Sequence, residues 1–180
     1  MDFTTKRLKV SEVCTADIAD IHKMNSYEKV AAFNTIGIPK DITDTEKLYQ
    51  PVLADKDQPE RSLYGWTIRS MADGGFIGVV GLKLSDKKFN MGEIHYSIIP
   101  YLWGNGYATE CVKAVINFGF EILKLHRIEA GVATENHYSI RVLEKVGMTR
   151  EGIRRKILPI RGEWKDNYHY AILDDDVREY

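Results

Sequence analysis

Two glycines between a strand pattern and a helix pattern offer the clearest chemistry in this sequence. They lie in the segment WGNGYA at residues 103–108, and Thr109 follows. The first amides of a helix have no partner inside the helix and lie at the positive end of its dipole. Because glycine and alanine leave room beside those amides, a phosphate can reach them. The pattern predicts an anion-binding loop, and a tight turn that binds nothing is the alternative.

The elements that must position this loop are a strand before it and a helix after it. The run from Glu93 to Ile99 is rich in β-branched and aromatic residues, which favours a strand. Pro100 ends that run because proline cannot donate to a sheet ladder. After the loop, apolar residues recur with the spacing of one helix face, at Val112, Val115, Ile116, Gly119, Phe120 and Leu123.

The rest of the chain predicts an antiparallel meander that leads into the loop, followed by one more strand and a hairpin. Strands are expected at residues 8–10, 62–69, 76–84, 126–132, 149–158 and 163–173, and helices at 16–25, 30–33, 45–54 and 139–146. Pro51 should break or kink the helix at 45–54. Since the strand at 126–132 follows a helix, it should lie parallel to the Glu93 strand.

The composition is that of one globular domain over residues 1–180, and it excludes several classes of protein. A formal net charge of −1 gives no basic footprint for nucleic acid. The N-terminus lacks a signal-peptide pattern, and no apolar run approaches membrane-spanning length. Cys14 and Cys111 fit no metal or redox motif, and the histidines lack metal spacing. We therefore expect a cytoplasmic protein without a bound metal.

The loop and several residues after it together resemble a known family. The segment from Glu93 to Glu110, with Asn136, Ser139 and LEKVGM at residues 143–148, resembles the GNAT superfamily of N-acetyltransferases. Its RimJ/RimL-like branch, which acetylates protein N-termini, looks closest. The resemblance implies an α/β fold of the mixed α+β kind. A central, mostly antiparallel sheet of about seven strands would be flanked by helices and splayed at a cofactor slot.

The resemblance implies that acetyl-CoA fills this slot. The pyrophosphate would bind the loop amides, and the pantetheine arm would pair with the strand backbone near its end, as an added strand does. A backbone N–H there would also hold the tetrahedral oxyanion. The family often has Gln or Arg where Trp103 stands, so this contact must differ. The residues expected to bind acetyl-CoA are Ile98, Ile99, Trp103, Gly104, Asn105, Gly106, Tyr107, Ala108, Thr109 and Asn136.

Acetyl transfer to an amine needs a base for the amine and an acid for the leaving thiolate. An α-amine, with a pKa near ~7.7–8.0, needs less help than a lysine-like amine near ~10.4. Glu93 is the first candidate base, and His95 on the same strand face is the second. The resemblance implies Ser139 as the acid, because Leu143 stands where many members have a tyrosine. Tyr138 is a weaker candidate acid, and Ser139 capping its helix is the structural alternative.

Three hypotheses follow from these residues. The leading one is an N-acetyltransferase that moves an acetyl group directly from acetyl-CoA to a primary amine, in a ternary complex. That amine is a protein N-terminal α-amine or a small-molecule amine. The second is a non-catalytic acyl-CoA-binding or regulatory module, because fold does not fix function. An ATP-binding enzyme is disfavoured, since no Gly-Lys-Ser/Thr follows the loop. A homodimer rests on the habit of the family alone.

Overall fold

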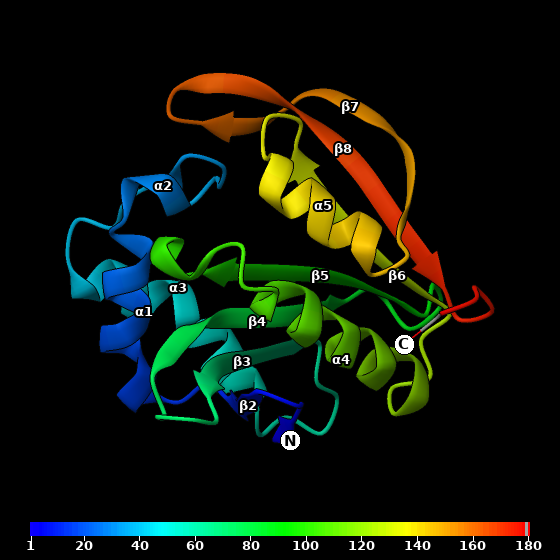
Figure 1. Cartoon of the computed structure of the whole chain (residues 1–180), viewed down its shortest axis with the longest axis horizontal. Helices are drawn as coiled ribbons and strands as arrows, with labels where there is room; N and C mark the ends of the chain where they lie inside the picture. Colours follow the sequence, from blue (N-terminus) through cyan, green and yellow to red (C-terminus); the bar gives the residue numbers. More distant parts are fainter. Residues whose placement is uncertain (179) are drawn as a thin grey trace.

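The computed structural model describes residues 1–178 and 180, and it contains one eight-stranded sheet with helices on both faces (Figure 1). The strand order is β1-β2-β3-β4-β5-β6-β8-β7. Neighbouring strands are antiparallel except for β5 and β6. The predicted α/β fold with a mostly antiparallel sheet is confirmed. The strand that the sequence analysis did not predict is the two-residue β1.

The observed elements follow the predicted order, with bounds shifted by a few residues. The strands are β1 (Phe3–Thr4), β2 (Leu8–Glu12), β3 (Leu63–Ser70), β4 (Phe76–Leu84), β5 (Met91–Ile98), β6 (Arg127–Ala133), β7 (Thr149–Ile160) and β8 (Glu163–Leu173). The α-helices are α1 (Ile18–Asn25), α2 (Glu28–Ala31), α3 (Ile42–Asp55), α4 (Tyr107–Glu121) and α5 (His137–Lys145). Single 3₁₀ turns lie at η1 (Thr15–Asp17) and η2 (Pro100–Leu102).

Strands β5 and β6 pair only near their beginnings, and this opens the sheet. Their parallel ladder runs from Met91 opposite Arg127 to Glu93 opposite Glu129. Beyond Glu93, β5 continues to Ile98 beside β4, whereas β6 continues beside β8. The predicted parallel pair and the predicted splay are both present.

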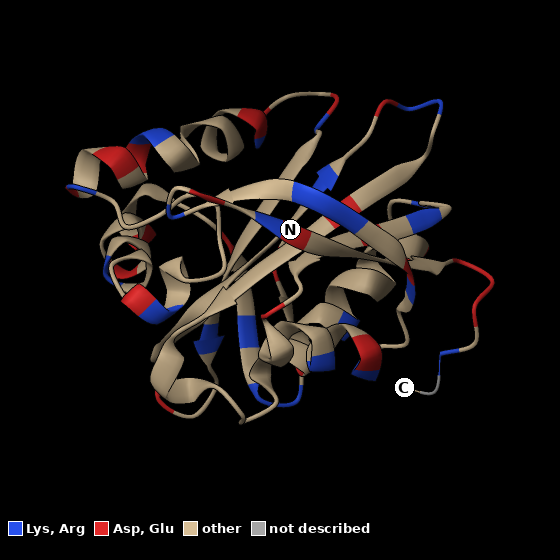
Figure 2. Ribbon diagram, turned by 90° about the horizontal axis from the view of Figure 1, so that it is seen from above, with Lys and Arg blue, Asp and Glu red and all other residues tan. Residues whose placement is uncertain are grey.

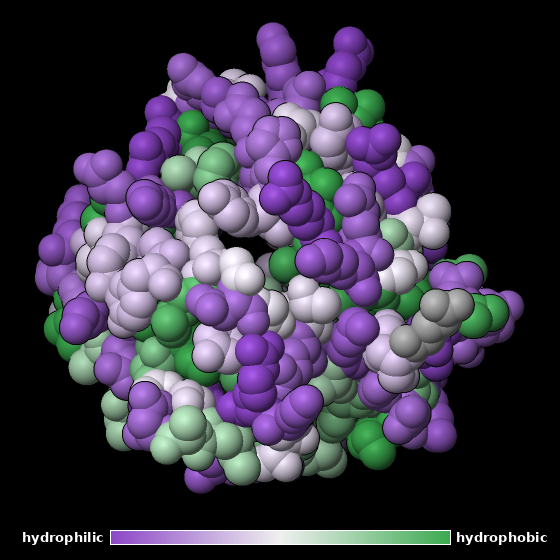
Figure 3. All heavy atoms as spheres, viewed as in Figure 1, coloured by the Kyte–Doolittle hydropathy of each residue, from purple (hydrophilic) through white to green (hydrophobic). Residues whose placement is uncertain are grey.

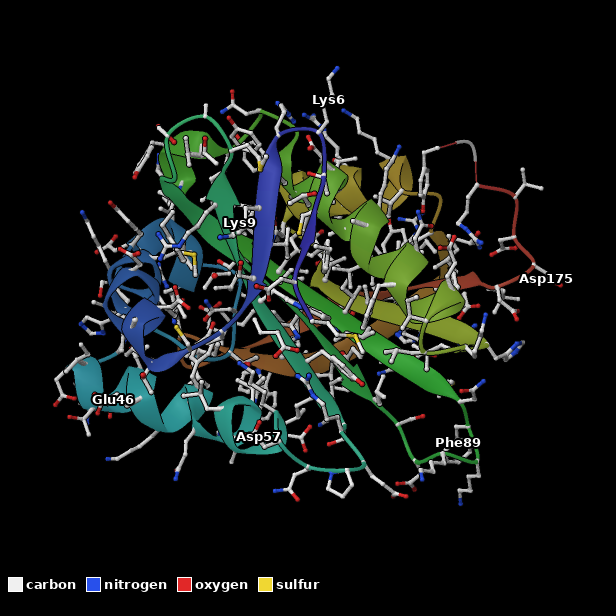
Figure 4. All side chains as sticks on the ribbon, turned by 90° about the horizontal axis from the view of Figure 1, so that it is seen from below. Lys6, Lys9, Glu46, Asp57, Phe89 and Asp175 are labelled. Atoms are coloured by element: carbon white, nitrogen blue, oxygen red, sulfur yellow. The ribbon has the colours of Figure 1, made fainter. Side chains whose placement is uncertain are left out.

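Helices cover the two faces of the sheet in different places. Helices α4 and α5 lie side by side on one face, over the main core around the fully buried Trp66 (Figure 1). Helices α1 and α3 cover the other face near β3 and β4, over a smaller cluster that includes Ile21 and Val79. Figure 4 shows α3 on the outside of the molecule, where Glu46 of this helix and Asp57 just beyond its end are exposed. The free edge of β5 lies between these two layers.

Two local features differ from the predictions. Helix α3 runs unbroken through Pro51, so the predicted break is wrong. The buried face of α3 explains this, because Tyr49 packs in the smaller cluster and Val52 lies against Gly65 of β3. Such tertiary packing outweighs the single amide hydrogen bond that proline removes. Helix α4 ends at Glu121, so Leu123 packs on the core from beyond the helix.

Charged residues are spread over the surface of the fold. Basic and acidic segments are interspersed in the view of Figure 2, as the net charge of −1 leads one to expect. In the part of the chain that the structure describes, no helix is both long enough and apolar enough to cross a membrane.

Gly78 lies where β4 meets the free part of β5, and the structure leaves no space there for a side chain. A Cβ would lie 2.1 Å from the Ser97 carbonyl oxygen and 2.9 Å from the Cα of Ile98. Because both are backbone atoms, the neighbouring strand itself would have to move. We expect Gly78→Ala to lower the free energy of unfolding by about 2 kcal/mol in urea denaturation. Gly152→Ala is the control, since a Cβ there meets no atom within 4 Å. Equal stability of the two variants would contradict this account.

Candidate active site

The free edge of β5 opens into a cavity of about 460 Å³. Four consecutive residues of β5, from His95 to Ile98, line this cavity. Successive side chains of a strand point to opposite faces, so the cavity reaches both faces of the sheet around the free edge. Figure 3 shows an opening near the middle of the molecule, in the region where Figure 1 has α5 above β5. One ligand can therefore bind on the α4–α5 face and meet a second ligand from the α1–α3 face.

The predicted anion-binding loop lies on the α4 side of this cavity. Gly104 and Gly106 have φ angles of 82° and 79°, in the left-handed region that favours glycine. Gly106 is the N-cap of α4 and provides no side-chain cap. Within residues 1–178 and 180, no hydrogen bond engages the backbone amides of residues 104–109. These amides are available to an anion.

An ion pair from the N-terminal segment holds the loop in place. The Glu110 carboxylate accepts hydrogen bonds from Thr5 Oγ1 at 2.6 Å, the Arg7 amide at 2.8 Å and Arg7 Nε at 2.7 Å. Arg7 Nη1 also donates to the Asn105 carbonyl oxygen at 3.0 Å. Burial by itself raises the pKa of Glu110, but these hydrogen bonds outweigh burial and hold that pKa below its ordinary value. The loop is therefore fixed before any ligand arrives.

Trp103 turns back onto β5. Its Nε1–H donates to the Ile98 carbonyl oxygen at 2.6 Å, and its ring centroid lies 5.1 Å from that of Tyr138 on α5. The Ile99 amide donates to the Ile77 carbonyl oxygen of β4. Because backbone groups alternate in direction along a strand, the amide and carbonyl of Ile98 face the slot instead. The Ile98 carbonyl is already bonded to the indole. A ligand that pairs with this strand must use the Ile98 amide unless the indole moves.

Ser139 lies at the start of α5 and lines the cavity. Its Oγ is 2.7 Å from the hydroxyl of Tyr96, which reaches across from β5. The cap of α5 is Asn136, whose Oδ1 accepts from the Ser139 amide at 3.1 Å, so Ser139 does not cap this helix with its hydroxyl. Burial raises the pKa of Tyr96, which keeps that hydroxyl protonated. The two hydroxyls form a short chain that can deliver a proton to the slot.

The two candidate bases on β5 have different surroundings. Glu93 is exposed and lies outside the lining of the cavity, because β5 is still paired with β6 at this position. His95 lines the cavity, and its ring lies over Gly81, where a Cβ would be 2.4 Å from Nε2. The cavity leaves the ring accessible, but protein atoms crowd around it, and this desolvation lowers the pKa of His95. Of the two candidate bases, His95 is the one that lies in the cavity.

Most of the predicted binding residues meet at this cavity. Its lining includes Ile98, Trp103, Gly104, Gly106, Tyr107, Ala108, Thr109, Asn136 and Ser139. Two predicted cofactor-binding residues lie outside it. Ile99 packs in the smaller core cluster and gives its amide to β4. Asn105 uses its side chain to donate to the Leu102 carbonyl oxygen at 3.0 Å, which fixes the turn instead.

Several lining residues were missed by the sequence analysis. Arg141 and Lys145 of α5 bring two cations to the cavity, and their i,i+4 spacing is a signal that the sequence does carry. Tyr96 was predicted only as part of a strand. Asn25 and Tyr49 also line the cavity, from α1 and α3. No local pattern marks these two residues, because their position depends on how the helices pack on β4.

Comparison with known proteins agrees with this geometry. The family described as "Acetyltransferase (GNAT) domain" matches residues 7–149. The probable N-acetyltransferase YjcK of Bacillus subtilis is 41% identical over 118 residues, which span 63% of each chain and so less than two thirds of that relative. The crystal structure of a GNAT-family acetyltransferase from Bacillus anthracis is 28% identical with a TM-score of 0.85, and the match covers 98% of this chain and 100% of that one.

Another similar structure was solved with ligands bound. Spermidine N-acetyltransferase from Vibrio cholerae, solved in complex with CoA and spermine, has a TM-score of 0.81 and 23% identity, with 93% of this chain and 95% of that chain covered. At this identity the likeness shows the fold alone. The family match itself spans most of the sequence and contains the splayed strands, the free loop amides and Ser139. The chain therefore belongs to the GNAT family of acetyl-CoA-dependent acetyltransferases.

Proposed function

We propose that this protein is an acetyl-CoA-dependent N-acetyltransferase. It moves an acetyl group to a primary amine, either a protein N-terminal α-amine or a small-molecule amine, by direct transfer in a ternary complex. The observation that carries the proposal is the cavity that reaches both faces of the sheet, with free loop amides on one side. A non-catalytic acyl-CoA-binding module is not favoured, because Ser139 lines the cavity and does not point away from it.

Acetyl-CoA binds on the α4–α5 face in this proposal. The amides of residues 104–109 bind the pyrophosphate at the N-terminus of α4. Arg141 and Lys145 lie on the same side of the cavity and attract the remaining phosphate charge. The pantetheine arm pairs with the Ile98 amide, since the carbonyl of that residue is bonded to Trp103. The thioester then lies at the free edge of β5, between the two faces.

The chemistry then uses three side chains that line the cavity. His95 takes a proton from the acceptor ammonium, and the free amine attacks the thioester carbonyl carbon. A C–N bond forms and the C–S bond breaks as the tetrahedral intermediate collapses. Ser139 protonates the leaving thiolate, and the Tyr96 hydroxyl returns a proton to Ser139 Oγ. The nitrogen of the collapsing intermediate loses its second proton to solvent, Tyr96 regains one from solvent, and His95 releases the ammonium proton to solvent before the next turnover. The proton that the new amide nitrogen loses balances the one that the thiolate gains.

Transfer through an acetylated cysteine is not part of this proposal. Cys111 is fully buried, and burial raises the pKa of its thiol, which suppresses the nucleophilic thiolate. Cys14 is exposed but does not line the cavity. The acetyl group therefore passes directly from the thioester to the amine.

The finer identity of the enzyme belongs to the same proposal. Asn136 and Ser139 support the RimJ/RimL-like branch, because this pair is what the resemblance to that branch rests on. Two free cysteines are typical of a reducing compartment, which supports a cytoplasmic location. The homodimer stays a prediction.

A thiol-release assay tests the proposed function. Free CoA is measured after mixing the protein with acetyl-CoA and a panel of peptides and small amines, and tryptophan fluorescence follows acetyl-CoA binding in parallel. We expect saturable binding, and CoA release that depends on the amine. If acetyl-CoA does not bind, the proposal is wrong. If it binds and no amine in the panel releases CoA, the non-catalytic module is the better description.

The role of His95 makes a prediction about pH. We expect His95→Asn to lower kcat/KM roughly tenfold near pH 7, a modest effect because an α-amine is partly deprotonated there. The lowered pKa of His95 keeps it neutral above the ordinary value of about 6.5, so the wild-type kcat/KM should fall below that pH. In the His95→Asn variant, the fall in kcat/KM that comes from protonating His95 should disappear. The fall that comes from protonating the acceptor amine should remain. Stability follows the same sign, because the unfolded chain binds this proton more readily and stability falls as the pH drops.

Glu93→Gln is the comparison for this measurement. Glu93 is exposed at the paired end of the two strands, so we expect its pH profile to match that of the wild type. A larger loss of kcat/KM in Glu93→Gln than in His95→Asn would show that the Glu93 carboxylate is the base.

A further inference from the structure

The side of the cavity away from the glycine loop forms a separate arm, which we call the acceptor arm. Helices α1, α2 and α3 and the segment between α2 and α3 enclose it, on the face opposite α4 and α5 (Figure 1). Its apolar walls are Val30, Phe33, Ile36 and Val79. If the proposed function holds, the group attached to the acceptor amine lies in this arm.

Asn25 is the least expected residue of the acceptor arm. It is the last residue of α1, and it is only 5% exposed. Within residues 1–178 and 180, its side-chain amide makes no hydrogen bond, although it lines the cavity. Among the described residues, the buried side-chain nitrogen or oxygen atom without a partner is Arg61 Nε, so the amide of Asn25 is open to the cavity and free to bond a ligand there.

Tyr49 adds a second group of the same kind. Tyr49 lines the arm from α3, and its hydroxyl, which bonds no described residue, is not enclosed by protein and can bond a ligand. Burial raises the pKa of Tyr49, so it remains a neutral donor and acceptor. His95, Asn34 and Ser97 also line the cavity, so the arm carries several uncharged hydrogen-bonding groups against apolar walls.

The charged side chains around the cavity are all basic. No Asp or Glu is found among the lining residues of the described chain, and the charged side chains that line it are Lys29, Arg141 and Lys145. Lys29 is exposed and comes from α2, on the side of the acceptor arm. A second ammonium group on an acceptor would find no carboxylate in this cavity and would be repelled by Lys29.

We propose that Asn25 and Tyr49 determine which amines are acetylated, by binding an uncharged or anionic hydrogen-bonding group next to the acceptor amine. This inference rests on the proposed function. The substrate class is an amine with an apolar side chain and a neighbouring carboxamide or carboxyl group, and with one positive charge at most. Polyamines are rejected. An Asn side chain suits a carboxamide because it donates and accepts at once, whereas a carboxylate would use only its N–H groups and those of Tyr49 and Lys29.

Four acceptors test this proposal by steady-state kinetics with acetyl-CoA. They are leucinamide, leucine, 3-methylbutan-1-amine and spermidine. The third is leucinamide without its carboxamide, and the rates are compared at equal concentrations of free amine. We expect kcat/KM for leucinamide to exceed that for 3-methylbutan-1-amine at least roughly tenfold, and that for spermidine by more. The ratio of kcat/KM for leucinamide to kcat/KM for leucine then shows whether the protein recognises an amide or a free carboxylate.

Variants assign the selectivity to the named residues. Asn25→Leu keeps the size of the side chain and removes its hydrogen bonds, so it should bring leucinamide down to the level of 3-methylbutan-1-amine. Tyr49→Phe should act in the same direction. Asn25→Asp adds the missing carboxylate and should raise kcat/KM for spermidine relative to leucinamide. Gln50→Leu is the matched control, because Gln50 is exposed on α3 and does not line the cavity. It should leave all four rates unchanged.

The outcomes separate this inference from the proposed function. Wild-type protein that uses spermidine as well as leucinamide would overturn the inference and leave the acetyltransferase standing. Equal losses for all four amines in Asn25→Leu, with a lower melting temperature, would make Asn25 a purely structural residue. Acetyl-CoA that binds without any amine releasing CoA would instead refute the proposed function itself.

Discussion

Replacing Ser139 with alanine is expected to lower kcat about a hundredfold, which is the usual scale for losing a positioned acid. Affinity for acetyl-CoA should hardly change, because the loop amides and the cations of α5 bind the phosphates without it. The fold should also persist. Asn136 still caps α5, and the Tyr96 hydroxyl keeps its hydrogen bond to the Ser139 carbonyl oxygen at 3.2 Å. Single-turnover rates and an acetyl-CoA titration measure the two quantities separately.

The Tyr96 hydroxyl, which bonds Ser139 Oγ, allows a second test of the same proton path. Tyr96→Phe should lower kcat by a similar factor, since it removes the group that returns the proton to Ser139 Oγ. The double variant should be little worse than either single one, because both residues serve one proton path. Tyr138→Phe is the control, because Tyr138 is 58% exposed and contacts Trp103 through its ring. A wild-type rate in Ser139→Ala would remove this serine from the mechanism, and a slow Tyr138→Phe would favour Tyr138 as the acid.

The second large effect is expected at the glycine loop. Gly106→Ala should weaken acetyl-CoA binding roughly tenfold to a hundredfold, the range expected when about one charge-assisted hydrogen bond is lost. Gly106 lines the cavity at the N-cap of α4, with φ at 79°. An added methyl group strains this backbone and takes up space beside the free amides. Equilibrium titration with acetyl-CoA measures the loss.

Gly162→Ala is the control that separates the effect of backbone strain from the loss of acetyl-CoA binding. Gly162 also has φ at 79°, in the turn between β7 and β8, and a Cβ there meets no atom within 4 Å. Both variants should therefore lose about 1–2 kcal/mol of folding free energy. Only Gly106→Ala should lose acetyl-CoA affinity. If both bind acetyl-CoA equally well, the diphosphate does not sit at this loop.

Features encoded by a short stretch of sequence were predicted correctly. The Glu93 strand, the loop with Gly104 and Gly106, and α4 follow from local residue types and spacing, because periodicity and left-handed glycines are properties of the chain itself. The end of α5, predicted at residue 146, is another case. Gly147 has φ at 86°, and its amide and that of Met148 bond back to the last turn of the helix.

What the tertiary structure alone decided is the chemistry around the slot. Tyr96 and Ser139 are far apart in the chain and meet because β5 parts from β6 after Glu93. The same splay leaves Glu93 outside the cavity and His95 inside it, although alternation puts both on one face of the strand. Asn25 lines the cavity only through the packing of α1 on β4. Local patterns determine which way a side chain points, but the neighbour that it meets depends on how distant elements pack, and no short stretch of sequence encodes that.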